Sequence, residues 1–153
     1  MFRGAHSVSV DAKGRFAIPA FYRQALLDAC GGRMVATVHQ ERCLLIYPQP
    51  EFQIFEQKLL SAGGMDPQVR KLQRFYIGRA HEAEMDKQGR ILLPAHLREW
   101  AGLENRAVLT GMGGCFELWS ETGWNREQEA ATDMLAPKDD DGAIPESLKG
   151  LSF

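Results

Sequence analysis

The chain contains one turn sequence twice, first as Asp11-Ala12-Lys13-Gly14-Arg15-Phe16-Ala17-Ile18-Pro19 and again as Asp86-Lys87-Gln88-Gly89-Arg90-Ile91-Leu92-Leu93-Pro94. Asp, Gly, Arg and Pro recur at an offset of 75 residues, and the match continues through Ala20/Ala95 and Arg23/Arg98. Residues 42–47 then align with residues 114–119 at an offset of 72. Two copies indicate an internal duplication and are too few for a solenoid. We therefore expect the halves to pair into one pseudo-symmetric domain.

Each copy of the turn predicts a tight connection between two strands. Residues 7–10 alternate polar and apolar side chains, which is typical of a half-buried strand. Asp11 can accept hydrogen bonds from nearby backbone amides, and Gly14 supplies the positive φ that other residues resist. Arg15 follows that glycine and is held at the rim of the turn. The second copy repeats this arrangement, with Phe16, Ile18, Ile91 and Leu93 predicted to face the core.

The rest of each half predicts a short helix, a hairpin and a longer helical segment. The fold class is therefore α+β and mostly β. Phe21 or Tyr22, Ala25, Leu26 and Ala29 are expected on the apolar face of the first helix, residues 20–30. The other expected elements are a helix over 95–101, hairpins over 34–47 and 107–119, a helical pair over 51–79 and a helix over 121–135. The expected units are 1–62 (first repeat with its trailing helix), 63–79 (connecting helix), 80–135 (second repeat with its trailing helix) and 136–153 (acidic mobile tail).

Composition and charge point to a polyanion-binding protein in the cytoplasm. The net charge is −2, but residues 1–98 carry +5 and residues 99–153 carry −7. A basic front with an acidic rear suits a nucleic-acid partner. The three cysteines form no CxxC pair, which favours reduced thiols. No apolar run approaches the roughly 20 residues that span a bilayer, and no signal peptide is recognisable, so we expect no membrane partner.

Catalytic and metal-binding patterns are missing from the sequence. The four histidines are scattered, without an HExxH or His/Cys ligand spacing. Residues 111–114 are glycine-rich but lack the spacing of a phosphate loop, and a hairpin turn is the better interpretation. No nucleophile elbow or paired-carboxylate arrangement is present. We therefore predict no enzyme activity, no cofactor, no metal and no small-molecule substrate.

The repeated basic turns are the strongest candidate site. Folding alone explains why a duplication keeps Asp, Gly and Pro, but it does not explain the arginine. Such side chains contact phosphates or read guanine edges in the major groove of DNA. The predicted DNA-binding residues are Lys13, Gly14, Arg15, Lys87, Gly89 and Arg90. Separately, apolar helical faces around Phe52, Phe55, Leu72 and Tyr76 predict a homo-oligomer.

These motifs together resemble the MraZ family of bacterial transcriptional regulators. The resemblance covers about residues 1–130 and rests on Met1-Phe2-Arg3-Gly4, the two turns, Ile18-Pro19-Ala20, Leu93-Pro94-Ala95 and Leu97-Arg98-Glu99. It implies a pair of AbrB-like swapped-hairpin β-barrel units in one chain and a ring-like homo-oligomer. It also implies a nucleoid-associated regulator of transcription that binds direct repeats in the promoter of its own division and cell-wall gene cluster. By the same resemblance Lys13, Arg15, Lys87 and Arg90 lie in the DNA-contacting loops.

Two other functions remain open at this point. One is an antitoxin-like protein-interaction module whose acidic C-terminal segment binds a partner protein, with DNA binding secondary. A long C-terminal segment with apolar anchors favours it, and Leu148, Leu151 and Phe153 are the anchors available. The other is a small-molecule enzyme or sensor, which needs a pocket with convergent polar groups that nothing in the sequence specifies.

Overall fold

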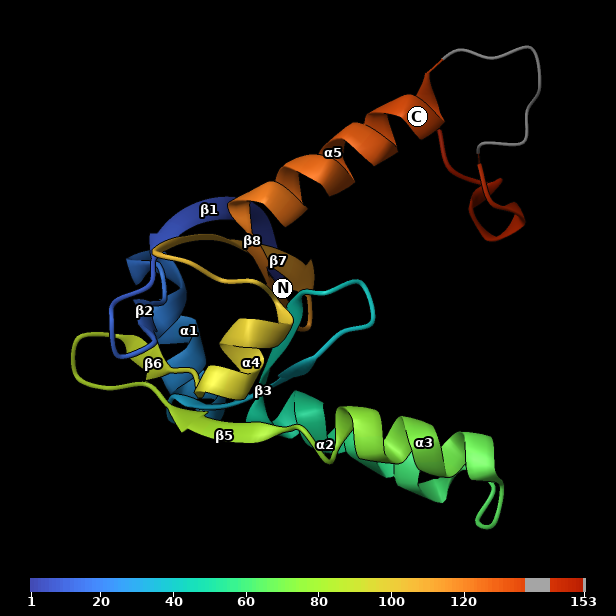
Figure 1. Cartoon of the computed structure of the whole chain (residues 1–153), viewed down its shortest axis with the longest axis horizontal. Helices are drawn as coiled ribbons and strands as arrows, with labels where there is room; N and C mark the ends of the chain where they lie inside the picture. The colour runs from blue at the N-terminus through green and yellow to red at the C-terminus, as the bar shows by residue number, and fades with distance from the viewer. Residues whose placement is uncertain (137–143, 153) are drawn as a thin grey trace.

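A six-stranded antiparallel sheet forms the centre of the molecule (Figure 1). The computed structural model describes residues 1–136 and 144–152. The mixed α+β class is confirmed. In spatial order the sheet consists of β1 (Phe2–Ser9), β7 (Arg106–Gly113), β8 (Phe116–Ser120), β4 (Leu44–Pro48), β3 (Arg33–Val38) and β5 (His81–Glu84). A separate two-stranded sheet pairs β2 (Arg15–Ala17) with β6 (Arg90–Leu92).

Each strand of the larger sheet has its repeat counterpart at the same distance from the opposite edge. Exchange maps β1 onto β5, β7 onto β3 and β8 onto β4, so a pseudo-two-fold axis passes between β4 and β8. The edge strands pair across the halves, because β1 of the first half pairs with β7 of the second and β5 of the second half pairs with β3 of the first. The duplicated halves therefore share one sheet.

The described strands do not close into the barrel that the resemblance implied. Strands β1 and β5 are the two edges of the larger sheet, and β2 and β6 pair only with each other. Across the first turn, an isolated antiparallel bridge pairs Val10 with Phe16. Strands β2 and β6 are each three residues long and are not part of the larger sheet.

The helices decorate this sheet much as the sequence predicts. They are α1 (Ala20–Cys30), α2 (Gln49–Ser61), α3 (Pro67–Tyr76), α4 (Ala95–Trp100), α5 (Glu121–Leu135) and a 3₁₀ turn over Glu146–Leu148. Asp66 caps α3, since its carboxylate accepts the backbone N–H of Gln68 at 2.8 Å. The α2–α3 pair and α5 form two arms that extend away from the side of the molecule that carries the basic turns (Figure 1).

The core lies where the alternating strand residues predict it. Phe16, Ile18, Ile91 and Leu93 are all at most 1% exposed. The apolar face of α1 differs from the prediction, because Tyr22, Leu26 and Cys30 are buried, whereas Ala25 and Ala29 are exposed and Phe21 is 64% exposed. The small alanine side chains lie on the solvent side of α1, and the larger Tyr22 ring fills the core instead.

The aromatic face expected to drive self-association is mostly covered within the chain. The rings of Phe55 and Tyr76 lie 5.6 Å apart, those of Phe52 and Phe55 lie 5.9 Å apart, and Phe52 is buried. Helix α3 folds back onto α2 and covers much of this surface, and the homo-oligomer stays a prediction. Leu72, at 48% exposed, is the one member of the set that stays open. Of the predicted tail, residues 137–143 and 153 lie outside the described residues.

Candidate nucleic-acid interface

The first basic turn is organised around the carboxylate of Asp11. Its Oδ1 accepts the backbone N–H of Lys13 at 3.0 Å and that of Arg15 at 2.9 Å. The N–H of Gly14 donates to the Asp11 carbonyl at 3.0 Å, and Gly14 has a φ of 91°. A side-chain oxygen that accepts successive amides fixes a turn without a longer strand pairing. Within the turn, the backbone is therefore held by hydrogen bonds to Asp11.

Asp11 also orients the arginine side chain. Its Oδ2 accepts the Nε–H of Arg15 at 2.8 Å, and the terminal Nη groups of Arg15 make no hydrogen bond within the described residues. The backbone N–H of Arg15, together with its guanidinium, lowers the pKa of Asp11 to about 2. The carboxylate is therefore ionised at neutral pH, and the guanidinium is presented in one orientation.

The second basic turn repeats this geometry. Asp86 Oδ1 accepts the N–H of Gln88 at 3.0 Å and that of Arg90 at 2.8 Å, and Asp86 Oδ2 accepts Arg90 Nε–H at 2.9 Å. Gly89 has a φ of 76°. Hydrogen bonds to the backbone N–H and the guanidinium of Arg90 lower the pKa of Asp86. The two arginines are thus equivalent in position and in their hydrogen bonds to the aspartate of the turn.

The neighbours of the two arginines are not equivalent. Lys13 aligns with Gln88, whereas Lys87 aligns with Ala12, so each turn carries its lysine at a different position. Gln88 Oε1 accepts a hydrogen bond from Arg90 Nη2 at 3.3 Å, and Lys13 offers no such acceptor to Arg15. The first turn therefore leaves its guanidinium freer than the second does.

The two turns are fastened to each other at one end of the molecule. The N–H of Leu93 donates to the Gly14 carbonyl at 2.9 Å, and the N–H of Ile18 donates to the Gly89 carbonyl at 2.8 Å. Pairing of β2 with β6 places the strands behind the turns side by side. Both turns project from the same side of the fold (Figure 1). Their spacing is therefore set by backbone hydrogen bonds.

A second pair of arginines supports the turns from the opposite half. Arg23 Nε donates to the Ile18 carbonyl at 2.8 Å, and Arg98 Nε donates to the Leu93 carbonyl at 3.1 Å. A Cβ on Gly14 would lie 2.6 Å from Arg98 Nε, and one on Gly89 would clash with Arg23 in the same way. Glycine is needed at each turn because an arginine of the other half lies against it. The sequence signal was the repetition of Arg23 and Arg98, to which no role was assigned.

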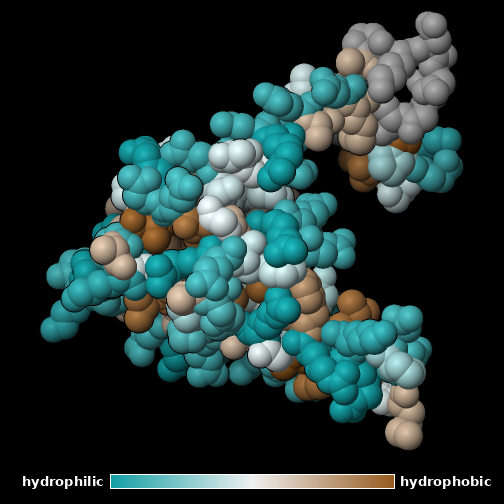
Figure 2. Space-filling view, in the orientation of Figure 1, coloured by the Kyte–Doolittle hydropathy of each residue, from teal (hydrophilic) through white to brown (hydrophobic). Residues whose placement is uncertain are grey.

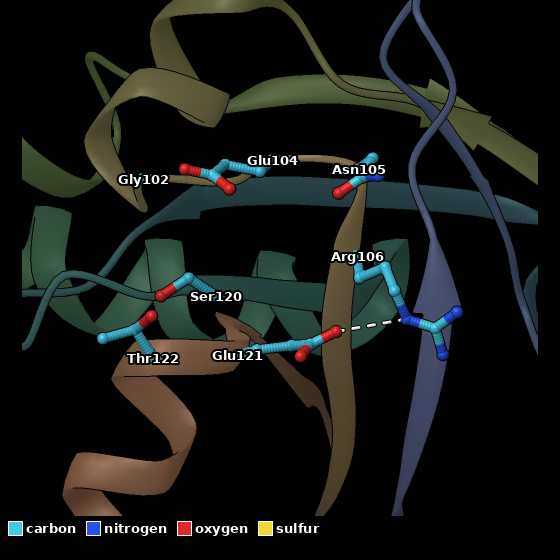
Figure 3. Close-up of a pocket in the computed structure, with 7 residues that line it drawn as sticks. All are labelled: Gly102, Glu104, Asn105, Arg106, Ser120, Glu121 and Thr122. Atoms are coloured by element: carbon cyan, nitrogen blue, oxygen red, sulfur yellow. Dashed lines mark hydrogen bonds and ion pairs between the residues drawn. The ribbon is translucent and has the colours of Figure 1, made fainter.

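A polar depression of about 310 Å³ lies elsewhere, between β7 and the start of α5 (Figure 3). Arg106 Nε and Glu121 Oε1 form an ion pair across it at 3.1 Å, and both side chains are about half exposed. The other residues that line the depression are Gly102, Glu104, Asn105, Ser120 and Thr122. The side chains that line the depression therefore carry hydroxyl, amide, carboxylate and guanidinium groups.

Metal and thiol chemistry are not built into the described part of the chain. Within residues 1–136 and 144–152, no group of three or more His, Cys, Asp or Glu side chains could hold a metal ion. The three cysteines are free, as predicted. Burial raises the pKa of the Cys115 thiol to about 11 and raises that of Cys43 further. These two thiols are therefore protonated and poorly nucleophilic at neutral pH.

The fold and the paired turns define the class of protein, namely a duplicated α+β binding protein that presents two rigid arginine turns on one side. A family described as "MraZ protein, putative antitoxin-like" matches the chain at residues 1–75 and again at residues 76–142. The chain belongs to the MraZ family.

Curated relatives match the whole chain and share one name. The protein from Nitrosomonas europaea is 49% identical over 153 residues, and the one from Thioalkalivibrio sulfidiphilus is 48% identical over 154 residues, with all of both chains covered in each case. A relative from Methylococcus capsulatus is 48% identical over 126 residues, which cover 82% of this chain and 83% of the relative. Each is named "Transcriptional regulator MraZ", which is the name of a regulator and not of an enzyme.

Proposed function

We propose that this chain is a sequence-specific DNA-binding transcriptional regulator whose contact surface is the pair of basic turns. The single observation that carries the proposal is the repeated geometry of two partly exposed arginines, each fixed through its Nε by an aspartate of its own turn. Family membership supports the same conclusion, because the relatives are named transcriptional regulators. The proposed contact residues are Lys13, Gly14, Arg15, Lys87, Gly89 and Arg90.

The geometry of the turns suits the major groove of DNA. That groove admits a two-stranded ribbon, and arginine reads guanine through a bidentate pair of hydrogen bonds to O6 and N7. Because Asp11 and Asp86 hold the guanidinium groups before DNA arrives, less side-chain entropy is lost on binding than for a free arginine. Lys13 and Lys87 then supply phosphate contacts that position the protein without reading sequence. Arg23 and Arg98 act as positioning residues beneath the turns.

The wider regulatory role follows from the family resemblance. We propose that the target is a set of direct repeats in the promoter of the chain's own division and cell-wall gene cluster, bound by a ring-like homo-oligomer on the nucleoid in the cytoplasm. Contacts that are weak singly become tight when tethered, because each later contact is intramolecular. A swapped-hairpin origin is supported by the pairing of β2 with β6 and of β1 with β7, which joins each turn's strands to the opposite half.

We also propose the domain boundaries that the sequence repeat suggests. The units are 1–62, 63–79, 80–135 and 136–153. Strand exchange means that the first and third units complete each other's sheet, so neither is proposed to fold alone.

An antitoxin-like interaction module is the second candidate, and the family description favours it directly. In that case a protein partner would bind the acidic C-terminal segment, and DNA contact would be secondary. Competition between a partner protein and promoter DNA would distinguish a shared surface from a separate one.

Substitution of the turn arginines tests the proposal. Arg15→Ala should weaken binding to DNA from upstream of the chain's own gene by about 1 to 3 kcal/mol per engaged turn, the range for a lost base-reading pair. Arg90→Ala should have an effect of the same sign. Arg126→Ala removes an exposed cation from α5, far from the turns, and is the matched control. Equal affinities for the parent and both turn variants, with folding intact, would remove the turns from the DNA interface.

A further inference from the structure

Helices α2 and α5 are equivalent elements of the repeat, yet only α2 has a partner helix. Each follows the last strand of its hairpin, β4 or β8, at an offset of 72 residues. On α2, Phe55 packs edge-to-face against Tyr76 of α3, and the Leu59 carbonyl accepts a hydrogen bond from Gln73 Nε2 at 3.1 Å. Glu127 and Ala131 occupy the matching positions of α5. No helix of the described chain covers that side of α5.

The outer half of α5 lacks tertiary support. Residues 128–136 are all exposed, and Met134 and Leu135 are 47% and 55% exposed. Figure 1 shows the helix projecting from the body, and Figure 2 shows apolar side chains near its far end. Helical stability in proteins comes mainly from packing, and isolated helices of 12 to 15 residues are marginal in water. A helix with this much exposed length is therefore suited to docking on another surface.

A cationic surface of the same chain has the opposite charge. We call it the basic flank and define it by Arg42, Lys71, Arg74 and Arg79. On α3, Lys71 precedes Phe75 by four residues and Arg74 by three. Arg79 follows the helix, and its guanidinium carbon lies 5.3 Å from the ring centroid of Phe75. Within the described residues, none of these four side chains forms an ion pair. The flank therefore presents four cations without carboxylate partners.

Two members of the basic flank crowd one indole ring. The guanidinium carbons of Arg42 and Arg79 lie 3.8 and 4.9 Å from the ring centroid of Trp100. The ring itself is fixed, because its Nε1 donates to the His39 carbonyl at 2.9 Å. Stacking on an aromatic face satisfies the flat side of a guanidinium and leaves its N–H edge available for an anion. Like charges held this close favour an anionic partner.

The backbone at Arg42 supports a role for this side chain. Arg42 has a φ of 68°, and it is the one residue other than glycine with a positive φ among those described. The residue that aligns with Arg42 in the second half is Gly114, and the left-handed residue of that turn is its neighbour Gly113, with a φ of 80°. Glycine adopts this conformation without strain, whereas arginine does not. The first half therefore keeps a strained arginine in a turn that the second half builds with glycine.

We propose that the basic flank of one copy binds the acidic α5 helix of a second copy. Helix α5 carries four carboxylates against one arginine, and α3 carries three cations and no carboxylate. Glu129 and Asp133, one turn apart on α5, face the cations of the flank. The α5 and α2–α3 arms diverge in the view of Figure 1, and hydrophilic side chains cover the visible side of the lower arm in Figure 2. A head-to-tail contact of this kind closes into a ring when the rotation between copies permits. The inference deepens the proposed self-association and is independent of how the turns read DNA.

Complementary charge reversals test the contact. One variant carries Lys71→Glu with Arg74→Glu, and the other carries Glu129→Lys with Asp133→Lys. Each reversed variant alone sets like charge against like, so light scattering at micromolar concentration should show a shift from the parent mass toward 17 kDa. In an equal mixture, the acidic flank of the first variant can bind the basic α5 of the second, and the basic flank of the second can bind the acidic α5 of the first. Both contacts then join opposite charges, and the parent mass should return. Arg3→Glu, on the edge strand β1, is the control and should keep the parent mass.

Three results would overturn the inference. They are a parent that is a single species near 17 kDa, reversed variants that keep the parent mass, or a mixture that stays dissociated. If Lys71→Glu with Arg74→Glu weakens DNA binding without changing the mass, the flank binds nucleic acid and not α5. Arg42→Gly adds a variant that relieves the backbone strain, so a loss of assembly with folding intact supports the guanidinium contact. A parent that assembles as described but binds no promoter DNA would overturn the proposed function alone.

Discussion

Replacement of Gly14 by alanine should destabilise the whole fold, because this turn glycine touches the other half of the chain. A Cβ would lie 2.6 Å from Arg98 Nε and 2.6 Å from the Leu93 carbonyl oxygen, and the latter is backbone that cannot simply rotate away. The left-handed conformation itself costs about 1 to 2 kcal/mol for a residue with a Cβ. Loss of the Arg98–Leu93 and Leu93–Gly14 hydrogen bonds adds about 0.5 to 1.5 kcal/mol each. We expect a loss of about 3 kcal/mol in the free energy of unfolding.

Urea denaturation with a matched glycine variant separates strain from contact. Gly102 also has a positive φ, 62°, but a Cβ there meets nothing within 4 Å. Gly102→Ala should therefore cost only the conformational part, about 1 kcal/mol. The predicted difference between the two variants is about 2 kcal/mol. If Gly14→Ala is no more destabilising than Gly102→Ala, the packing of Arg98 against the opposite turn does not stabilise the fold, and the support assigned to the second arginine pair is wrong.

Three further predictions concern the turns and the thiols. Each phosphate neutralised contributes about −0.9 to the slope of log affinity against log salt, so Lys13→Gln should flatten that slope by about one unit per engaged subunit without changing the preferred sequence. Lys87→Gln tests the second turn in the same way. Unchanged slopes in both variants would exclude phosphate contacts by these lysines. Because folding lowers the pKa of Asp11 from 3.8 to about 2, its carboxylate stabilises the fold fully above pH 4 and loses that effect as the pH falls toward 2. The difference in unfolding free energy between the parent and Asp11→Asn should therefore shrink across that interval, and a difference that is constant with pH would contradict it. Burial raises the pKa of Cys43, so iodoacetamide at pH 8 should modify it only after unfolding, and rapid labelling of the native protein would show that the thiol is accessible.

Much of the fold follows from local patterns in the sequence. Asp11 and Gly14 determine the first turn through contacts with residues no more than four positions away, so the repeat alone predicts its conformation. The same is true of the alternating core residues and of the cap at Asp66. Helix α1 begins and ends where its proline and glycines predict.

Contacts between segments that are distant in the sequence could not be predicted from local patterns. The support that Arg98 gives to Gly14 joins residues 84 positions apart, and nothing in the local sequence distinguishes it from a solvated arginine. The return of α3 over Phe55 of α2 is a tertiary contact, so local patterns could not predict how much of this apolar face the chain covers itself. The barrel was expected from family resemblance, whereas the short β2 and β6 strands leave the larger sheet open.

The central claim is that the two arginine turns form a sequence-specific DNA interface. The most direct test is a fluorescence anisotropy titration of duplex DNA from upstream of this chain's own gene against shuffled duplex of the same composition, at two salt concentrations. The account predicts tighter binding to the upstream duplex at both salts, and loss of that preference when Arg15 and Arg90 are both replaced by alanine. Equal affinity of the parent for the upstream and shuffled duplexes, or a preference that survives in the double variant, would contradict it.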